Sequence, residues 1–316
     1  MGVASVERIH QPVLVGRVVE LLSAALRQAE RPVFVDATLG LGGHSEALLA
    51  ACPAACGIGF DRDPQALALA RQRLASDSAR MAFVAANYDQ LRASLDQLGV
   101  GRVDAILLDL GLSSLQIDSP ERGFAYATDA PLDMRMTPGD GPTAADLLNT
   151  WPEADLARIF RLYGDEPRAG RIARAIVARR DAQPFATSAQ LVEAVRAATP
   201  APERGGHPAK RVFQALRIAV NDELDSLEKA LPQALDGLRP GGRLVVLAYH
   251  SGEDRLVKRA FARAAADRVP DGLPQVPDDL RATHRLLTKG AERAGEAETT
   301  ENPRAASARL RAIEAR

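Results

Sequence analysis

Short apolar runs alternate with stretches of helical spacing over the first third of this chain. Four of the runs have the length and composition of buried strands: Val33–Val35, Ala55–Phe60, Met81–Ala85 and Val103–Leu108. Runs that are apolar throughout are typical of parallel strands covered on both faces. The pattern therefore predicts a doubly wound α/β domain built on a parallel sheet.

The pattern changes after Ser113, and no parallel strand is predicted between residues 116 and 213. Helical spacing recurs there in four segments, Thr143–Asn149, Glu153–Leu162, Arg168–Arg180 and Ser188–Ala198. The α/β pattern resumes at Gln214 with a long helical stretch, which we expect Pro232 to interrupt. A turn at residues 240–242 then leads into a fifth strand, 243–249.

The end of the chain predicts two closing antiparallel strands, at residues 284–288 and 308–313. The charged stretch 290–303 between them predicts a mobile loop. At 316 residues the chain has room for two domains. We therefore predict a discontinuous α/β domain, residues 1–115 and 214–316, and an inserted helical domain for substrate recognition, residues 116–213.

Overall charge and composition narrow the classes of function. With 40 basic and 41 acidic residues the net charge is −1, so any contact with nucleic acid must come from local basic clusters. No apolar run has the length of a membrane span, and the N-terminus lacks an apolar signal region, so we expect a cytoplasmic protein without membrane contact. The two cysteines, Cys52 and Cys56, are expected to be buried and unpaired.

A glycine turn follows the first predicted strand, at Gly40, Gly42 and Gly43. Glycine lets the backbone approach a ligand closely, and a strand–glycine turn–helix unit is typical of nucleotide-like ligand sites. Asp61 ends the second strand about twenty residues later, where a carboxylate can bind both hydroxyls of a ribose. On the glycines alone, an ordinary strand–turn–helix corner is the alternative interpretation.

The identity of the ligand depends on Ser45, which stands where the dinucleotide fingerprint requires its third glycine. The pattern D-x-T-x-G-x-G-G-H from Asp36 to His44 instead resembles motif I of the class I S-adenosylmethionine methyltransferases. A nicotinamide-dependent oxidoreductase on the same architecture is the alternative. Asp109 and the pair Tyr249–His250 end two further strands, and the carboxyl ends of parallel strands face one crevice.

Longer motifs resemble one family, the bacterial methyltransferases that modify the exocyclic N4 of a decoding-centre cytosine in 16S ribosomal RNA. The matching segments begin at His10 (HQPVL), Asp36 (DATLGLGGHSEALL), Gly59 (GFDRDPQAL), Leu107 (LLDLGLSSLQID), Glu121 (ERGFAYATDAPLDMRM), His207 (HPAKRVFQALRIAVNDEL), Gly241 (GGRLVVLAYHSGEDRLVK) and Asn302 (NPRAASARLRAIE). The resemblance implies a class I methyltransferase sheet, parallel with an antiparallel C-terminal hairpin, and S-adenosyl-L-methionine as cofactor. The residues it implies for the cofactor site are Gly40, Gly42, Gly43, His44, Asp61, Tyr88, Asp109 and Gln116.

The chemistry expected of this family needs a group that hydrogen-bonds a weakly nucleophilic amine and so activates it for attack. The lone pair of a cytosine amine is delocalised into the ring, and a carboxylate that accepts the amine hydrogens would localise it. Asp109 is ionised at its reference pKa of about 3.9 and can do this. His250 is the rival for that task, because Asp109 also matches a cofactor position and carries no Pro-Pro-aromatic motif after it. The reaction requires no metal.

Substrate contacts are predicted from flat and from basic side chains. A flipped cytosine needs an apolar surface, for which Phe124, Tyr126 and Tyr249 are candidates, and Asp133 and Arg135 are expected to shape the cleft. Packing of the insertion is the alternative role of Phe124 and Tyr126. Three basic sets are candidates for contacts to RNA: Arg168, Arg171, Arg174 and Arg179; Lys210, Arg211 and Arg217; and Arg255, Lys258, Arg259 and Arg263.

Several alternatives stay open at this level. The histidines at 10, 207 and 284 are expected to be structural. The protein is expected to be a monomer or homodimer acting on RNA within the small ribosomal subunit, and the sequence does not decide between naked RNA and an assembled subunit. A non-catalytic ribosome-assembly factor that kept the fold is a further alternative.

Overall fold

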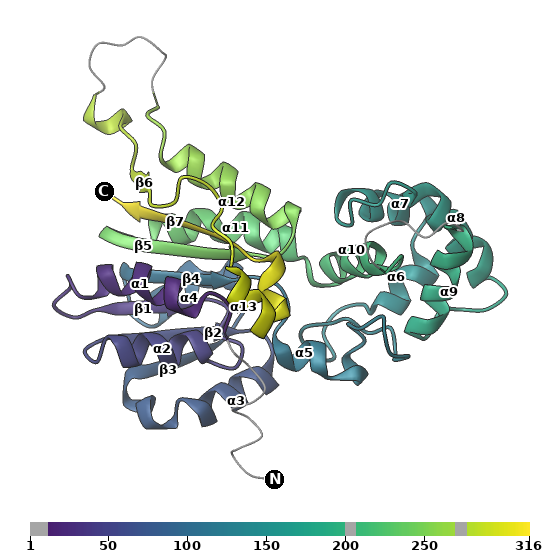
Figure 1. Ribbon diagram of the computed structural model, residues 1–316, viewed down its shortest axis with the longest axis horizontal. Coiled ribbons are helices and arrows are strands. Elements are labelled where there is room, and N and C mark those ends of the chain that lie inside the picture. The colour runs from purple at the N-terminus through teal and green to yellow at the C-terminus, as the bar shows by residue number, and fades with distance from the viewer. Residues whose placement is uncertain (1–11, 200–206, 269–276) are drawn as a thin grey trace. The chain divides into compact units, whose positions relative to one another are not determined.

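The computed structural model describes residues 12–199, 207–268 and 277–316 (Figure 1). The chain forms two compact units, an α/β unit of Met1–Gly111 with Asp225–Arg316 and a helical unit of Leu112–Leu224. The sequence pattern placed the boundaries at 115/116 and 213/214. Both boundaries differ because Leu112 and helix α10 (Lys210–Asn221) pack in or against the core of the helical unit. His10 lies outside the described residues.

The α/β unit contains a seven-stranded sheet with the order β3-β2-β1-β4-β5-β7-β6 (Figure 1). Its strands are β1 (Val33–Asp36), β2 (Cys56–Asp61), β3 (Met81–Ala85), β4 (Val103–Asp109), β5 (Leu238–Ala248), β6 (His284–Leu286) and β7 (Arg309–Ala315). The first five strands pair in parallel, whereas β7 runs antiparallel to both β5 and β6. The predicted α/β fold class, with its antiparallel close, is confirmed.

Alternation along the strands divides the core of this unit into two layers. On β1, Phe34 belongs to the apolar cluster of one sheet face and Val35 to that of the other. Leu107 and Leu108 of β4 divide in the same way. Successive side chains of a strand point to opposite faces, so an entirely apolar strand must be covered on both.

Two groups of helices provide this cover. The first face carries α1 (Val15–Leu26), α2 (Gly43–Ala51) and α3 (Pro64–Arg73), and the second carries α4 (Leu91–Gln97), α11 (Glu223–Asp236) and α12 (Ser251–Ala264). A further short helix, α13 (Glu296–Glu301), precedes β7. Within the described ranges, no helix is both apolar and long enough to span a bilayer.

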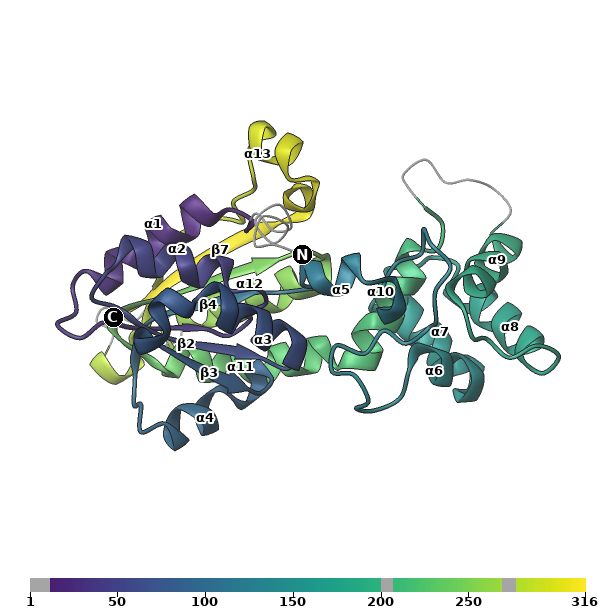
Figure 2. The same cartoon turned by 90° about the horizontal axis from the view of Figure 1, so that it is seen from below.

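The helical unit has its own core. It contains α5 (Ser114–Asp118), α6 (Ala144–Thr150), α7 (Glu153–Leu162), α8 (Ala169–Arg180), α9 (Ser188–Ala198) and α10. Helices α7, α8 and α9 are neighbours in space as well as in sequence (Figure 2). Each contributes a fully buried side chain to the core of this unit: Phe160, Ile172 and Leu191. Capping boxes at Thr143 and Thr187 fix where α6 and α9 begin, since each threonine side chain pairs with the third residue of its helix.

Two expectations about helix and strand ends are wrong. Pro232 lies inside α11 and does not interrupt it. The residue is exposed, so water can bond the carbonyl that loses its N–H partner. The helix break falls instead at Asp222, whose φ of 50° ends α10. The expected turn at residues 240–242 lies within β5, where the pairing with β4 shifts register between Val103 and Ala105.

Two further expectations need correction. Residues 290–303 contain helix α13, and Glu292 forms an antiparallel bridge with Leu310, so this segment is bound to the sheet rather than forming an open loop. Cys52 is buried as expected, but Cys56 is exposed. It is the first residue of β2, and its position at the strand end leaves its side chain beyond the packed layer.

Candidate active site at the carboxyl edge of the sheet

Side chains from four adjacent strands meet at the carboxyl edge of the sheet. Asp61 ends β2, Asp36 ends β1, Asp109 ends β4, and Tyr249 follows β5. In the order β2-β1-β4-β5, strand β1 lies at the point where the chain crosses from one half of the sheet to the other. Ligands of open α/β sheets bind at this crossover.

The glycine turn after β1 has no room for side chains. Gly42 has a φ of 80° and caps α2, a backbone conformation that glycine adopts without strain. A Cβ on Gly43 would lie 2.5 Å from Cγ of Pro12. The turn therefore packs directly under residues 12–14, the described segment that precedes α1.

Asp61 binds this turn through one carboxylate oxygen and the segment after β2 through the other. Oδ2 accepts a hydrogen bond of 2.8 Å from the backbone N–H of Gly40, and Oδ1 accepts one of 2.8 Å from that of Asp63. Burial raises the pKa of Asp61 to about 6, against the lowering effect of these two N–H groups. Each oxygen keeps a second lone pair, so the carboxylate can also accept hydrogen bonds from a diol.

Asp109 contacts side chains from two other segments. The hydroxyl of Tyr249 donates a hydrogen bond of 2.6 Å to its Oδ1, and Nδ1 of His44 lies 3.5 Å from its Oδ2. The backbone N–H of Asp109 donates to Oγ1 of Thr38 at 2.6 Å. Burial raises the pKa of Asp109 to about 6, and His44 and the Tyr249 hydroxyl oppose that rise. Burial also raises the pKa of Tyr249 well above its usual value, so it stays a donor.

His44 connects this carboxylate to the segment before α1. Its Nε2 lies 3.0 Å from the carbonyl oxygen of Val13, which can only accept a hydrogen bond. Nε2 therefore carries a proton. Asp36 lies on the same side of the site, and its carboxylate accepts hydrogen bonds from Ser45 Oγ at 2.8 Å and from the backbone N–H of Thr38 at 3.3 Å. Burial raises the pKa of Asp36, with His44 as the largest opposing charge.

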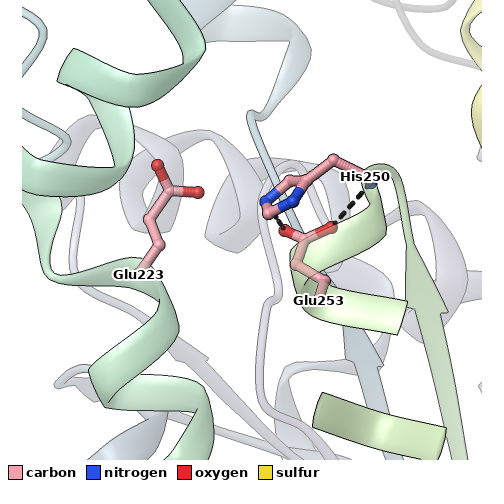
Figure 3. Close-up of side chains that lie close together, drawn as sticks. All are labelled: Glu223, His250 and Glu253. Carbon is pink, nitrogen blue, oxygen red and sulfur yellow. Dashed lines mark hydrogen bonds and ion pairs between the residues drawn. The ribbon is translucent and has the colours of Figure 1, made fainter. Parts of the chain in front are cut away.

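His250 caps helix α12. Its Nδ1 accepts from the backbone N–H of Gly252 at 3.2 Å, and its own backbone N–H donates to Oε2 of Glu253 at 3.2 Å (Figure 3). Nε2 lies 3.3 Å from Oε1 of Glu253, within ion-pair distance but without the alignment of a hydrogen bond. Glu253 also accepts from the backbone N–H of Tyr249 at 2.7 Å. The pair thus holds the turn between β5 and α12.

The other predicted cofactor residues occupy separate places. Tyr88 opens a short 3-10 helix after β3, and its half-buried ring packs on the second face of the α/β unit. Gln116 belongs to the helical unit, where it is buried and forms the capping box of α5 with Ser113. Its side-chain oxygen accepts from the backbone N–H of Ser113 at 3.1 Å.

The predicted substrate residues of the helical unit form internal contacts. Phe124 is 9% exposed and belongs to the core. Arg135 pairs with Asp133 through two nitrogens, at 2.9 and 2.6 Å, and also donates to the carbonyl of Gly141. Tyr126 stacks on His207, with ring centroids 4.6 Å apart. These contacts fix the loop between α5 and α6 without excluding a contact to substrate.

The three basic sets differ in exposure and in the ion pairs that their side chains make. Arg217 makes two hydrogen bonds to Glu223, at 2.7 and 2.8 Å, and is 16% exposed. Arg179 pairs with Glu193 at 2.7 Å. On α12 the four basic residues are exposed and follow helical spacing along one side: Arg255, Lys258, Arg259 and Arg263. This exposed side, the α12 basic face, begins at the carboxyl edge of the sheet.

Sequence reasoning missed three groups of this site. Thr38 stands inside the D-x-T pattern, but its role as acceptor for the backbone of Asp109 has no signature in spacing. The carbonyl of Val13 and the carboxylate of Glu298, which accepts from the backbone N–H of Leu14 at 2.6 Å, come from opposite ends of the chain. Such long-range pairs leave no local pattern in a sequence.

The fold and the site define the class of protein. A sheet of this order, with a glycine turn after β1 and carboxylates at the ends of β2 and β4, is the arrangement of class I methyltransferases. A sequence profile of the MraW methylase family matches residues 7–316. The chain belongs to this family, which confirms the resemblance seen in its motifs.

Curated relatives match over nearly the whole chain. "Ribosomal RNA small subunit methyltransferase H" of Nocardioides sp. is 57% identical over 307 residues, which cover 96% of each chain. The protein of the same name from Acidothermus cellulolyticus is 57% identical over 308 residues, 97% of this chain and 93% of the relative. That of Mycolicibacterium smegmatis is 54% identical over 311 residues, 96% of this chain and 83% of the relative.

Proposed function

We propose that this protein transfers a methyl group from S-adenosyl-L-methionine to the exocyclic N4 of a decoding-centre cytosine in 16S ribosomal RNA of the small subunit. The names of the relatives support the substrate class. The observation that carries the proposal is the half-buried carboxylate of Asp109, which lies at the same edge of the sheet as the glycine turn. Such a group suits an amine as methyl acceptor. The cytoplasm, where ribosomal subunits are made, is the expected location.

The residues present fit the cofactor. Asp61 keeps lone pairs for the two ribose hydroxyls, and Gly42, with its φ of 80°, lets the turn after β1 follow a path that a side chain would strain. Tyr88 lies after β3, where a ring can pack beside the adenine. When bound, S-adenosylmethionine supplies an electrophilic methyl group, whose bond to sulfur breaks with the electron pair left on sulfur.

The amine chemistry falls to Asp109 in this proposal. An ionised carboxylate that accepts the amine hydrogens localises the nitrogen lone pair and stabilises the positive charge that develops during attack. Stabilisation of this kind is typically worth about 3–4 kcal/mol, or roughly 10²–10³ in rate. His250 stays the rival for this task, although its ring nitrogens already face Gly252 and Glu253.

The RNA is proposed to contact both units. The α12 basic face can bind phosphates, and the helical unit, with Asp133 and Arg135 in its long loop, is proposed to recognise the substrate. Phe124 and Tyr249 were predicted to hold the flipped base. Phe124 is 9% exposed, which leaves little of its ring for a base, and the Tyr249 hydroxyl is bonded to Asp109.

The test is methyl transfer from labelled S-adenosylmethionine to small subunits that lack their native methyl marks, with naked 16S RNA run in parallel. Mass spectrometry of the nucleosides is expected to show N4-methylcytidine. Labelling of a different nucleoside would overturn the N4 assignment, and cofactor binding without any transfer would overturn the substrate class.

The Asp109→Ala variant separates the enzyme from a non-catalytic assembly factor on the same fold. We expect it to lose transfer by roughly 10²–10³-fold. An assembly phenotype that survived the same substitution intact would favour the assembly role. The matched control is Asp104→Ala, which removes a carboxylate of β4 that faces Arg239 and the backbone N–H of Val33 at the start of β1.

A further inference from the structure

The contacts of Asp109 divide its two oxygens between different partners. Oδ1 accepts the short bond from the Tyr249 hydroxyl, at 2.6 Å, and Oδ2 faces Nδ1 of His44, at 3.5 Å. The carboxylate is 18% exposed and the imidazole 6% exposed, so water cannot replace either partner freely. The two contacts therefore define which oxygen is bound and which is available.

The tautomer of His44 follows from its second contact. The carbonyl of Val13 requires the proton of the neutral ring on Nε2, which leaves a lone pair on Nδ1. A lone pair and an ionised carboxylate oxygen repel one another at this distance. A proton placed between Oδ2 and Nδ1 removes that repulsion, whether it is bound to the oxygen or to the nitrogen.

We propose that Tyr249 is a positioning residue: its hydroxyl holds Oδ1 of Asp109, so that Oδ2 is the oxygen that accepts the proton released by the methylated amine. This inference rests on the proposed function and extends it. Tyr249 therefore acts through its hydroxyl on Asp109, in addition to any packing of its ring.

The proton balance of this step is complete. The amine nitrogen forms its bond to the methyl carbon and is left with one proton too many. That proton moves to Oδ2 of Asp109, the oxygen beside Nδ1 of His44. Asp109, which is 18% exposed, then releases the proton to solvent and returns to its ionised form before the next turnover.

The charges around Asp109 decide the direction of a titration. The Tyr249 hydroxyl and any positive charge on His44 favour its ionised form, whereas Asp36 and Glu253, on β1 and α12, oppose it. The pKa of Asp109 is about 6 with all four in place. Removing the hydroxyl alone removes a stabilising hydrogen bond to the anion, so the pKa must rise further.

The experiment compares the full-length protein with Tyr249→Phe, which loses the hydroxyl, and Tyr249→Leu, which also loses the ring. The pH dependence of kcat is expected to have an acid limb near 6 in the wild type, and in Y249F that limb moves up by roughly one pH unit or more. At pH 8.5 the kcat of Y249F recovers, and the KM for S-adenosylmethionine stays within about twofold throughout. A purely packing role of Tyr249 predicts an unchanged profile for Y249F and a loss in Y249L only, which would overturn the inference.

A second measurement is independent of activity. The carboxyl 13C resonance of Asp109, assigned through Asp109→Asn, is titrated in the wild type and in Y249F. We expect the higher midpoint in Y249F, and equal midpoints would overturn the positioning role even if methyl transfer is confirmed. If the midpoints differ but no N4-methylcytidine forms on any subunit, the proposed function fails and the proton transfer to Asp109 fails with it, whereas the Tyr249–Asp109 contact stands.

Discussion

The backbone N–H of Leu14 donates a hydrogen bond of 2.6 Å to the side-chain carboxylate of Glu298, across a sequence separation of 284 residues. Leu14 is the residue immediately before α1, and its φ of 52° is in the left-handed region, so the chain turns at this point into the helix. A second pair supports the first, because Arg17 makes two hydrogen bonds to Glu292, at 2.8 and 2.9 Å. The region around α13 thus holds residues 12–14 against the glycine turn.

This relationship predicts the effect of Glu298→Ala. The Leu14 N–H loses its acceptor, so we expect the free energy of unfolding to fall by about 1–2 kcal/mol in urea. The affinity for S-adenosylmethionine should fall as well, because Val13 and Pro12 contact His44 and Gly43. Glu298→Gln keeps an acceptor oxygen and is the control, expected to retain most of both quantities. Equal losses in the two variants would show that charge, not the hydrogen bond, is what matters.

Gly43→Ala tests the same segment from the other side. The added Cβ would lie 2.5 Å from Cγ of Pro12, a ring atom that cannot rotate away. Residues 12–14 must shift, and we expect the Kd for S-adenosylmethionine, measured by calorimetry, to rise roughly tenfold. Gly16→Ala is the matched control, since Gly16 lies in α1 and an added Cβ meets nothing within 4 Å. An unchanged Kd in G43A would show that residues 12–14 do not contribute to the cofactor site.

Asp109→Asn should stabilise the protein while it abolishes transfer. The pKa of Asp109 is about 6 in the folded protein, against the ordinary value of 3.8 for an aspartate in water. The folded state therefore binds more protons between these values, and the wild type loses stability as the pH rises through this window. An asparagine amide does not ionise, so the variant does not lose this stability. Its oxygen can accept from the Tyr249 hydroxyl, and its NH₂ group can donate to His44.

The sign and size of this effect can be measured. The D109N variant should match the wild type below pH 4 and exceed it above pH 7 by about 1–3 kcal/mol, in urea unfolding followed by circular dichroism. Thr38→Val serves as the control, because it removes the acceptor for the backbone N–H of Asp109 without changing a titrating group. A constant difference between D109N and the wild type across this pH range would contradict the raised pKa.

The α12 basic face predicts a change in salt dependence. Replacing Arg255, Lys258 and Arg259 by Gln should weaken binding to the small subunit, and lower the slope of log K against log salt by roughly two to three. The affinity for S-adenosylmethionine should not change. The control removes three exposed arginines near the opposite edge of the sheet, Arg27, Arg31 and Arg102. Equal losses in both triple variants would mean that net charge alone attracts the RNA.

The sequence predicted the strands well because each is a continuous apolar run between polar turns. Met81–Ala85 is observed as predicted, and β1 and β4 each extend by one residue to include Asp36 and Asp109. Pro232 was misjudged, since local propensity cannot show that its helix face meets solvent. The sequence also predicted which side chains stand at the strand ends, among them Asp61, Asp109 and Tyr249.

The contacts those side chains make could not be predicted in the same way. The bond from Tyr249 to Asp109 joins residues 140 positions apart, and that from Leu14 to Glu298 joins the two ends of the chain. Both depend on how distant elements pack, and a hydroxyl in a sequence does not show its acceptor. The ring of Tyr249 suggested stacking, whereas its hydroxyl is the group that contacts Asp109.

The position of β7 has a consequence for synthesis. This strand, Arg309–Ala315, is the last along the chain but lies between β5 and β6 in the sheet. Translation delivers residues in order, and among the described strands β6 pairs only with β7, so β6 cannot join the sheet before β7 has been made. The Leu14 N–H likewise has no acceptor from Glu298 until that residue has been made. The segment before α1 therefore takes its final place against the glycine turn late in synthesis, although it is made first.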